Sequence, residues 1–324
     1  MAKTALAVLL AALAVGAVWF GWNWRVERET RDGQTVAWRI VPRGEPPVSV
    51  PLWADPAVPA RAPTPTFRMA GFCIDGLDDR KLSHPRMAEV LLQTVPQFEL
   101  IALMGFPAPI RGEPARIVEA VNSAAGRKYA WIAGGEPNHS NHRILSAVLY
   151  DQTAIEVDPT TVHWVNDPAG AFVCPPLVAQ FRVRGPPPEQ AFTFRLIVAR
   201  VDPSRADEDM SLLAQVFRTV RDEPHGEDDI ILLGTLETDE TRLGELGRLP
   251  DLTAALFGAP STVRGTRRAD NILFQRRVTS EFNHRAEVLD VMRQCRITVD
   301  QAAELFEHLP FWAEFKSFED RPAP

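Results

Sequence analysis

Short hydrophobic segments with two different periodicities follow one another along the chain after residue 65. Segment 67–74 is an apolar run of strand length, segment 84–95 has apolar residues at helical spacing, and segment 99–104 is apolar after its first residue. Together they predict a strand–helix–strand unit. Further predicted elements are strands at 144–150, 177–183, 192–201, 230–233, 270–274 and 311–315, and a long helix at 211–221.

The strands differ in how many of their faces are apolar. Some are apolar at nearly every position, as expected for burial on both faces, whereas others alternate with polar residues, as expected for burial on one face. This mixture predicts an α/β architecture in which two mixed β-sheets pack on each other and helices cover their outer faces.

The N-terminus carries a different pattern. Residues 4–24 are almost wholly apolar, which is about the ~20 residues that a helix needs to cross a bilayer core. Trp19, Trp22 and Trp24 gather at its end, followed by Arg25 and Arg28, as is typical of a membrane interface. Residues 1–24 are therefore predicted to be a single-pass transmembrane anchor; a cleaved signal and a buried helix are the alternatives. Charge leaves the orientation open, and the signal-like start favours an extracytoplasmic domain.

Residues 25–65 form a predicted juxtamembrane segment and linker. Within it, residues 34–41 alternate like a short strand, and eight prolines lie between positions 42 and 65. Proline fixes φ and removes a donor, so a stiff extended tether is expected. The folded domain is predicted to span residues 66–324.

Composition narrows the classes of function. Among 324 residues, 45% are hydrophobic and 24% charged, which is normal for a globular protein, and the formal net charge is −7. An acidic chain lacks the strongly basic face that gripping nucleic acid requires. The three cysteines, at positions 73, 174 and 295, show no metal-site spacing. They are predicted to be buried small hydrophobes, with one disulfide as the alternative.

The most informative local feature lies near the C-terminus, in the segment Glu-His-Leu-Pro-Phe-Trp-Ala-Glu-Phe at 307–315. It places His308, preceded by Glu307, at the mouth of an apolar strand, where a group that titrates near neutral pH can be held rigidly.

Six motifs in one order carry a resemblance to a known family. They are FRMAGFCI at 67–74, ELIALMGF at 99–106, LIVAR at 196–200, IILLGTLET at 230–238, ADNI at 269–272 and FEHLPFWAEF at 306–315. This order resembles the endonuclease/exonuclease/phosphatase superfamily of deoxyribonuclease I-like proteins over nearly the whole predicted domain. The resemblance implies a four-layer α/β sandwich and phosphoester hydrolysis with a divalent cation, a pair of histidines and an Asp that orients the attacking water.

Most of the residues that this chemistry needs are replaced. The family's first-strand Asn falls on Cys73, its metal-binding Glu on Gly105, its first His on Arg200, the Asp and Asn of its GDxN turn on Thr235 and Glu237, and a phosphate-binding Arg on Cys174. Asp270 and His308 keep their identity, and Glu307 replaces an Asp. Glycine offers no side-chain ligand and threonine no carboxylate, so no metal site and no cofactor are expected, with Mg²⁺ or Mn²⁺ only if the protein is active.

Two functions follow from this pattern. The first is a membrane-tethered pseudoenzyme whose cleft binds an anionic or phosphate-bearing ligand, or a protein partner, without hydrolysing it. The alternative is a divergent metal-dependent phosphodiesterase or nuclease that uses His308 and Asp270 with relocated carboxylates.

Each candidate residue also has a structural interpretation. His308, Asp270 and Glu307 are the candidate catalytic residues, but a hydrogen-bonded structural histidine fits the same pattern. Arg200 and Glu237 are the candidate substrate-binding residues. A permanent guanidinium suits an anion, whereas for Glu237 a solvated acidic loop is the more usual explanation.

Overall fold

The computed structural model describes residues 24–31, 34–42, 58–136, 139–223 and 227–320. The chain divides into two compact units, Met1–Leu52 and Trp53–Pro324. In the first unit, strand β1 (Trp24–Arg31) pairs antiparallel with β2 (Gln34–Pro42). The strand predicted at 34–41 is therefore confirmed, and its partner is the segment just before it.

Two six-stranded sheets form the second unit. The first sheet has the order β13 (Phe282–Val288), β14 (Phe311–Lys316), β3 (Thr66–Cys73), β4 (Leu100–Pro107), β6 (Ile144–Asp151), β5 (Tyr129–Ile132). The second has the order β11 (Leu252–Ala254), β12 (Asp270–Gln275), β10 (Ile230–Thr235), β9 (Thr193–Arg200), β8 (Leu177–Val183), β7 (Ile155–Trp164). Both sheets are mixed, because β3–β4 and β9–β10 are parallel pairs among antiparallel neighbours.

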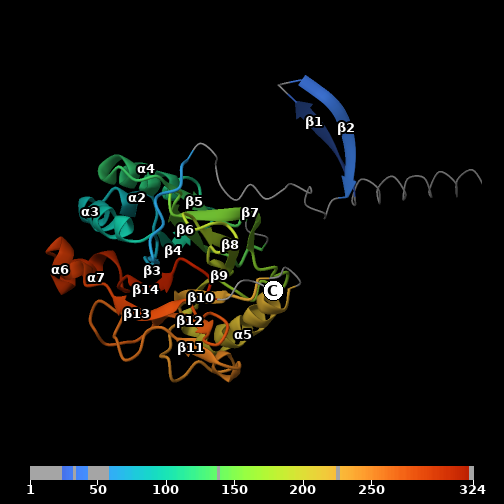
Figure 1. Ribbon diagram of the computed structural model, residues 1–324. Coiled ribbons are helices and arrows are strands. Elements are labelled where there is room, and N and C mark those ends of the chain that lie inside the picture. The colour runs from blue at the N-terminus through green and yellow to red at the C-terminus, as the bar shows by residue number, and fades with distance from the viewer. Residues whose placement is uncertain (1–23, 32–33, 43–57, 137–138, 224–226, 321–324) are drawn as a thin grey trace, which may run out of the picture. The chain divides into compact units, whose positions relative to one another are not determined.

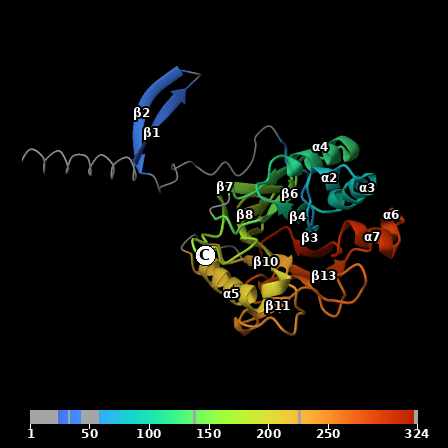
Figure 2. The ribbon, with the colours of Figure 1, turned by 180° about the vertical axis from the view of Figure 1, so that it is seen from behind.

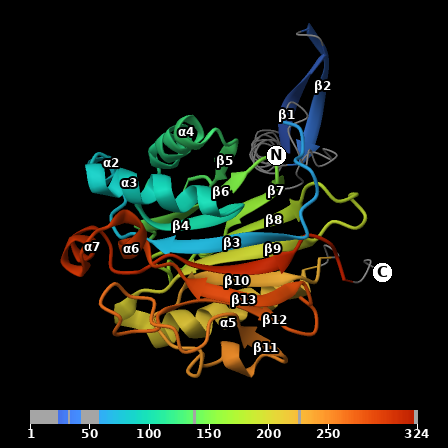
Figure 3. The ribbon, with the colours of Figure 1, turned by 60° about the vertical axis from the view of Figure 1, so that its left-hand side comes forward.

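The helices lie outside the two sheets. On the first sheet they are α2 (Asp79–Leu82), α3 (Pro85–Thr94), α4 (Glu113–Ala125), α6 (Val291–Cys295) and α7 (Val299–Leu305). The second sheet is covered by α5 (Ala206–Asp222). The short 3₁₀ turns are η1 (Val95–Gln97), η2 (Pro203–Arg205) and η3 (Leu246–Arg248). Figure 3 shows the two sheets stacked between α3 and α4 on one side and α5 on the other, which is a four-layer sandwich.

Side-chain alternation on β10 shows why its sequence is apolar throughout. Ile231 and Leu233 point into the core between the sheets, whereas Ile230 and Leu232 pack under α5. Each face of the strand is thus buried against a different layer, as the uninterrupted apolar run predicts.

Aromatic rings fill the space between the sheets. Phe67 of β3 stacks on Phe194 of β9 with ring centroids 5.8 Å apart, and Phe315 of β14 meets Phe274 of β12 edge-on at 5.8 Å. These contacts join strands of opposite sheets, and all four rings are buried. They fix how the ends of the strands, which carry the candidate residues, face one another.

The structure also bears on the predicted long helix, the cysteines and the proline-rich linker. The long helix is confirmed but begins five residues earlier than predicted, at Ala206. All three cysteines are buried and free, which confirms their interpretation as small hydrophobes. The end of the proline-rich segment is attached to the sandwich, because the Arg61 N–H donates to the Thr153 carbonyl at 2.8 Å. The rest of that linker and the predicted domain boundaries stay predictions.

The predicted membrane anchor falls outside the described residues, except for Trp24, where β1 begins. No helix in the described part of the chain is long and apolar enough to span a bilayer.

Seen from behind in Figure 2, α5 and α4 flank the second unit on opposite sides.

Candidate functional site

Strand ends from both sheets bring the candidate residues to one edge of the sandwich. Arg200 ends β9, Thr235 ends β10 and Asp270 begins the antiparallel β12, and the register places Thr235 between the other two. Cys73 ends β3 of the facing sheet, and His308 lies just before β14 of that sheet. Parallel strands present their carboxyl ends together, so the topology collects these side chains.

Asp270 is the centre of one half of the site. Its buried carboxylate accepts hydrogen bonds from Thr235 Oγ1 at 2.5 Å, from Ser261 Oγ at 2.6 Å and from His308 Nδ1 at 2.9 Å. Both carboxylate oxygens are therefore used by protein groups. Asp270 acts here as an acceptor that fixes three neighbours.

His308 is held between two carboxylates. Its Nδ1 contacts Asp270, and its Nε2 lies 3.4 Å from Glu237 Oε1. Burial alone would lower the pKa of His308, but the charges and hydrogen bonds of Asp270 and Glu237 outweigh it and raise that pKa to about 10. The ring is a buried imidazolium at neutral pH, with both nitrogens engaged.

Glu237 reaches His308 from a left-handed turn after β10, with φ 56°. Burial raises its pKa, but the bonds from His308 and Arg267 prevail, so the net pKa is lowered and the carboxylate is charged. Its side chain is buried, so the alternative of a solvated acidic loop is wrong for this residue. Arg267 pairs with both Glu237 and Glu307.

Glu307, by contrast, points away from the site. Its side chain is 62% exposed and pairs with Arg267 at the rim. A chain of alternating charges thus runs outward from Asp270 through His308, Glu237 and Arg267 to Glu307.

Arg200 occupies the other half of the site. Its Nη2 lies 2.7 Å from Asp75 Oδ1 and its Nε donates to the same oxygen at 3.0 Å. Burial opposes its charge, yet Cys73 and Asp75 raise the pKa of Arg200 further above its ordinary value. Burial, with help from Asp75, raises the pKa of the Cys73 thiol, so that sulfur is neutral. A guanidinium therefore fills the position where the resemblance places a proton-transferring histidine.

The backbone at Gly105 is also specialised. Gly105 has φ 107°, and a Cβ there would lie 2.2 Å from the Ile74 carbonyl oxygen. The register between β4 and β6 shifts at this position, as in a β-bulge. At the position where the resemblance places a metal-binding Glu, the strand therefore has a backbone conformation that only glycine adopts without strain.

These residues do not fit the Mg²⁺ or Mn²⁺ that the fold family implies. Among the described residues, no group of three His, Cys, Asp or Glu ligand atoms within 4.8 Å of one another includes Asp270, Glu237 or Asp75. Gly105 and Thr235 contribute no carboxylate, and the Arg200 cation repels a metal ion. A hard cation that needs several oxygen ligands finds no set of them here.

The structure brings together Asp270, His308 and Glu237, places Arg200 beside them with Asp75, and leaves Glu307 at the rim. Sequence reasoning missed Ser261, which lies in a loop with no motif and is recognisable only through its bond to Asp270.

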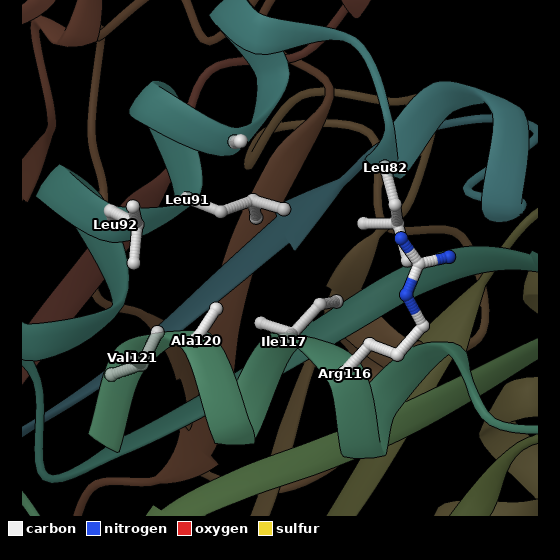
Figure 4. Close-up of a pocket in the computed structure, with 8 residues that line it drawn as sticks. Leu82, Leu91, Leu92, Arg116, Ile117, Ala120 and Val121 are labelled. Atoms are coloured by element: carbon white, nitrogen blue, oxygen red, sulfur yellow. The ribbon is translucent and has the colours of Figure 1, made fainter. Parts of the chain in front are cut away.

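A groove between α3 and α4, lined by Leu91, Ile117 and neighbouring apolar side chains (Figure 4), lies outside this site and offers little polar chemistry beyond Arg116.

Comparisons with known proteins identify the fold. No family model matches the chain, and no curated protein matches it by sequence. A crystal structure of TDP2 from D. rerio, humanized by 14 mutations, is 13% identical and superposes with a TM-score of 0.55, covering 78% of this chain and 99% of that one. A protein of unknown function from Enterococcus faecalis V583 is also 13% identical, with a TM-score of 0.53 over 78% and 100% of the two chains.

A third structure is the mannosyl-6-phosphatase Bt3783 of Bacteroides thetaiotaomicron, 14% identical with a TM-score of 0.52 over 76% of this chain and 98% of that one. At these identities the likeness concerns the fold. The four-layer α/β sandwich that the six motifs imply is thereby confirmed as a fold shared with these structures.

Proposed function

We propose that this chain, which has the endonuclease/exonuclease/phosphatase fold, is a membrane-anchored, non-catalytic protein that binds an anionic, phosphate-bearing ligand at the Arg200 side of its cleft. The observation that carries the proposal is the engagement of His308, whose two ring nitrogens both face carboxylates. Both ring nitrogens of His308 therefore contact protein carboxylates, and Arg200 is the group suited to binding an anion.

Proton transfer argues against hydrolysis. A general base needs a pKa near the working pH and a nitrogen within reach of the nucleophile. The pKa of His308 is about 10, so the ring is already protonated, and Glu237 stands at the nitrogen that would face a substrate. With Thr235 in place of the water-orienting carboxylate, the site also lacks the other group that the reaction needs.

Ligand binding is supported by the asymmetry of the Arg200–Asp75 pair. The Arg200 side chain is 8% exposed, whereas that of Asp75 is 54% exposed. A phosphate oxygen can replace the Asp75 carboxylate on the fixed guanidinium, because Asp75 can turn into water at little cost. The fold's occurrence in a mannosyl-6-phosphatase, and in a TDP2 crystallised with a single-stranded DNA product, agrees with a phosphate-bearing ligand.

A turnover assay separates this proposal from a divergent metal-dependent phosphodiesterase. The full chain is incubated with Mg²⁺ or Mn²⁺ and a generic phosphodiester or phosphomonoester, and no release above the protein-free rate is expected. Metal-dependent turnover that His308→Ala abolishes would overturn the proposal and establish the alternative, which uses His308 and Asp270.

Anion binding is tested separately with inorganic phosphate and pyrophosphate in calorimetry. Arg200→Met should abolish the binding heat, whereas Arg205→Met, at a half-exposed arginine paired with Glu208, should retain it. Equal binding by both variants would place the anion elsewhere.

Membrane attachment rests on the apolar segment 4–24 and is tested by fractionation. The full chain should stay with membranes after an alkaline wash, and a chain that lacks residues 4–24 should be released. Protease protection of the domain in sealed vesicles then tests the predicted extracytoplasmic orientation.

A further inference from the structure

A second group of acidic side chains lies at the end of the sheets away from His308. Asp229 directly precedes β10, Glu281 directly precedes β13 and Glu319 follows the end of β14, whereas His308 precedes the start of β14. The length of the strands therefore separates this group from the candidate site. Asp229 comes from one sheet, and Glu281 and Glu319 come from the other.

Three carboxylates converge closely here. One oxygen each from Asp229, Glu281 and Glu319 lies within 4.8 Å of the other two. Asp229 is 4% exposed and Glu281 is 2% exposed, and Asp229 Oδ1 and Glu281 Oε2 accept no hydrogen bond from the described residues. Buried carboxylate oxygens without partners are rare, because desolvation is unfavourable unless another group replaces the lost water.

A hydroxyl joins the group. Thr279 Oγ1 is buried and also has no hydrogen-bond partner of normal geometry among the described residues. It lies close enough to the Asp229 carboxyl for the two side chains to interact. A neutral oxygen ligand thus stands beside the three acidic ones.

Backbone N–H groups fix how the outer oxygens lie. The N–H of Thr193 donates to Glu319 Oε1 at 2.8 Å, and the N–H of Asp320 donates to Glu281 Oε1 at 2.9 Å. One oxygen of each glutamate is thereby held by the chain. These backbone hydrogen bonds position the two glutamate side chains and leave the second oxygen of Glu281, Oε2, buried.

The nearby cations are engaged with other acids. Lys316 pairs with Asp320, and Arg195 pairs with Glu223. Among the described residues, neither of these cations pairs with Asp229, Glu281 or Glu319.

We infer that Asp229, Glu281 and Glu319, with the Thr279 hydroxyl, bind a divalent cation of the calcium type that clamps the two sheets together at the end opposite the candidate site. Ca²⁺ takes oxygen ligands at about 2.3–2.6 Å in flexible geometry, so two ligands of one ion can lie up to about 5 Å apart. The three carboxylate oxygens, all within 4.8 Å of one another, satisfy that limit. Mg²⁺ requires a tighter octahedron and binds more weakly at such a site.

The test uses thermal unfolding of the full chain in EDTA and across a CaCl₂ titration to about 10 mM, beyond the weakest class of calcium sites, with calorimetry for affinity. The parent should gain several degrees in Tm with Ca²⁺ and less with Mg²⁺. Absence of any calcium-dependent shift in the parent overturns the inference.

Two variants locate the ion. Glu281→Gln should lose the calcium response, with affinity lowered at least about tenfold, yet it should be no less stable than the parent in EDTA, because one crowded charge is gone. The matched control is Asp228→Asn, at the exposed residue next to Asp229, which should respond like the parent. A calcium response that survives in Glu281→Gln, or that disappears in Asp228→Asn, contradicts the assignment.

Discussion

Gly105 is a position where the structure sharply limits what a substitution can do. The resemblance places a metal-binding Glu here, so Gly105→Glu is the obvious attempt to restore hydrolysis. The backbone at φ 107° and the Ile74 carbonyl, 2.2 Å from the site of a Cβ, oppose any side chain. We expect Gly105→Ala and Gly105→Glu to be destabilised by similar amounts, because the first side-chain carbon already clashes.

The magnitude follows from two contributions. A non-glycine residue in this backbone region costs on the order of 1–3 kcal/mol. Relieving the contact moves the Ile74 carbonyl by roughly 1 Å, since ordinary contacts begin above 3 Å, and disturbs the hydrogen bond from the Ile74 N–H to Met104, worth about 1 kcal/mol. The expected loss in free energy of unfolding is therefore about 2–4 kcal/mol.

Two glycines provide matched controls in the same urea titration. Gly126 has φ 61° with open space around it, so Gly126→Ala should cost only about 1–2 kcal/mol of backbone strain. Gly112 has neither a positive φ nor a neighbour within 4 Å, so Gly112→Ala should fall within about 0.5 kcal/mol of the parent. The reasoning is refuted if Gly105→Ala unfolds at the same urea concentration as Gly126→Ala.

Three further predictions concern the buried charges and thiols. The pKa of His308 is raised to about 10 in the folded chain. Its contribution to the free energy of unfolding is therefore complete below about pH 6.5 and is lost as the pH rises towards 10. Urea titrations from pH 7 to 10 should show a steeper loss of stability in the parent than in His308→Gln. Asp75→Asn should destabilise more than Arg200→Met, since it leaves a buried guanidinium unpaired, whereas the latter leaves only a half-exposed carboxylate; equal losses would contradict this. Burial raises the pKa of Cys174 and of Cys295 to about 11, so thiol reagents at pH 8 should label no cysteine until the chain unfolds, and rapid labelling of the native protein would contradict their burial.

Periodicity predicted the strands that are buried on both faces, since every residue of such a strand meets an apolar layer. It missed α4, in which only four residues, Glu113, Pro114, Ile117 and Val121, are buried. The ends of this helix are at Gly112 and Gly126, which provide no capping side chain. Periodicity also missed β7, whose exposed middle breaks the apolar pattern.

Motif order identified Asp270 and His308 as candidate site residues, but the sequence could not show which groups each of them contacts. The contact between Glu237 and His308 depends on a left-handed turn, and the contact of Ser261 with Asp270 depends on a loop folding back over β12. Both arise from tertiary geometry without a local signal. They change the interpretation of His308 from a residual base to a buried cation.

The protonation state of His308 tests the central claim most directly. Nitrogen NMR of the histidine side chains, assigned with His308→Gln, reports whether each ring carries one proton or two. At pH 8 we predict a doubly protonated His308 ring whose signals titrate only near pH 10. A His308 ring that is neutral at pH 7, with one nitrogen unprotonated, would contradict the account and make a catalytic base available.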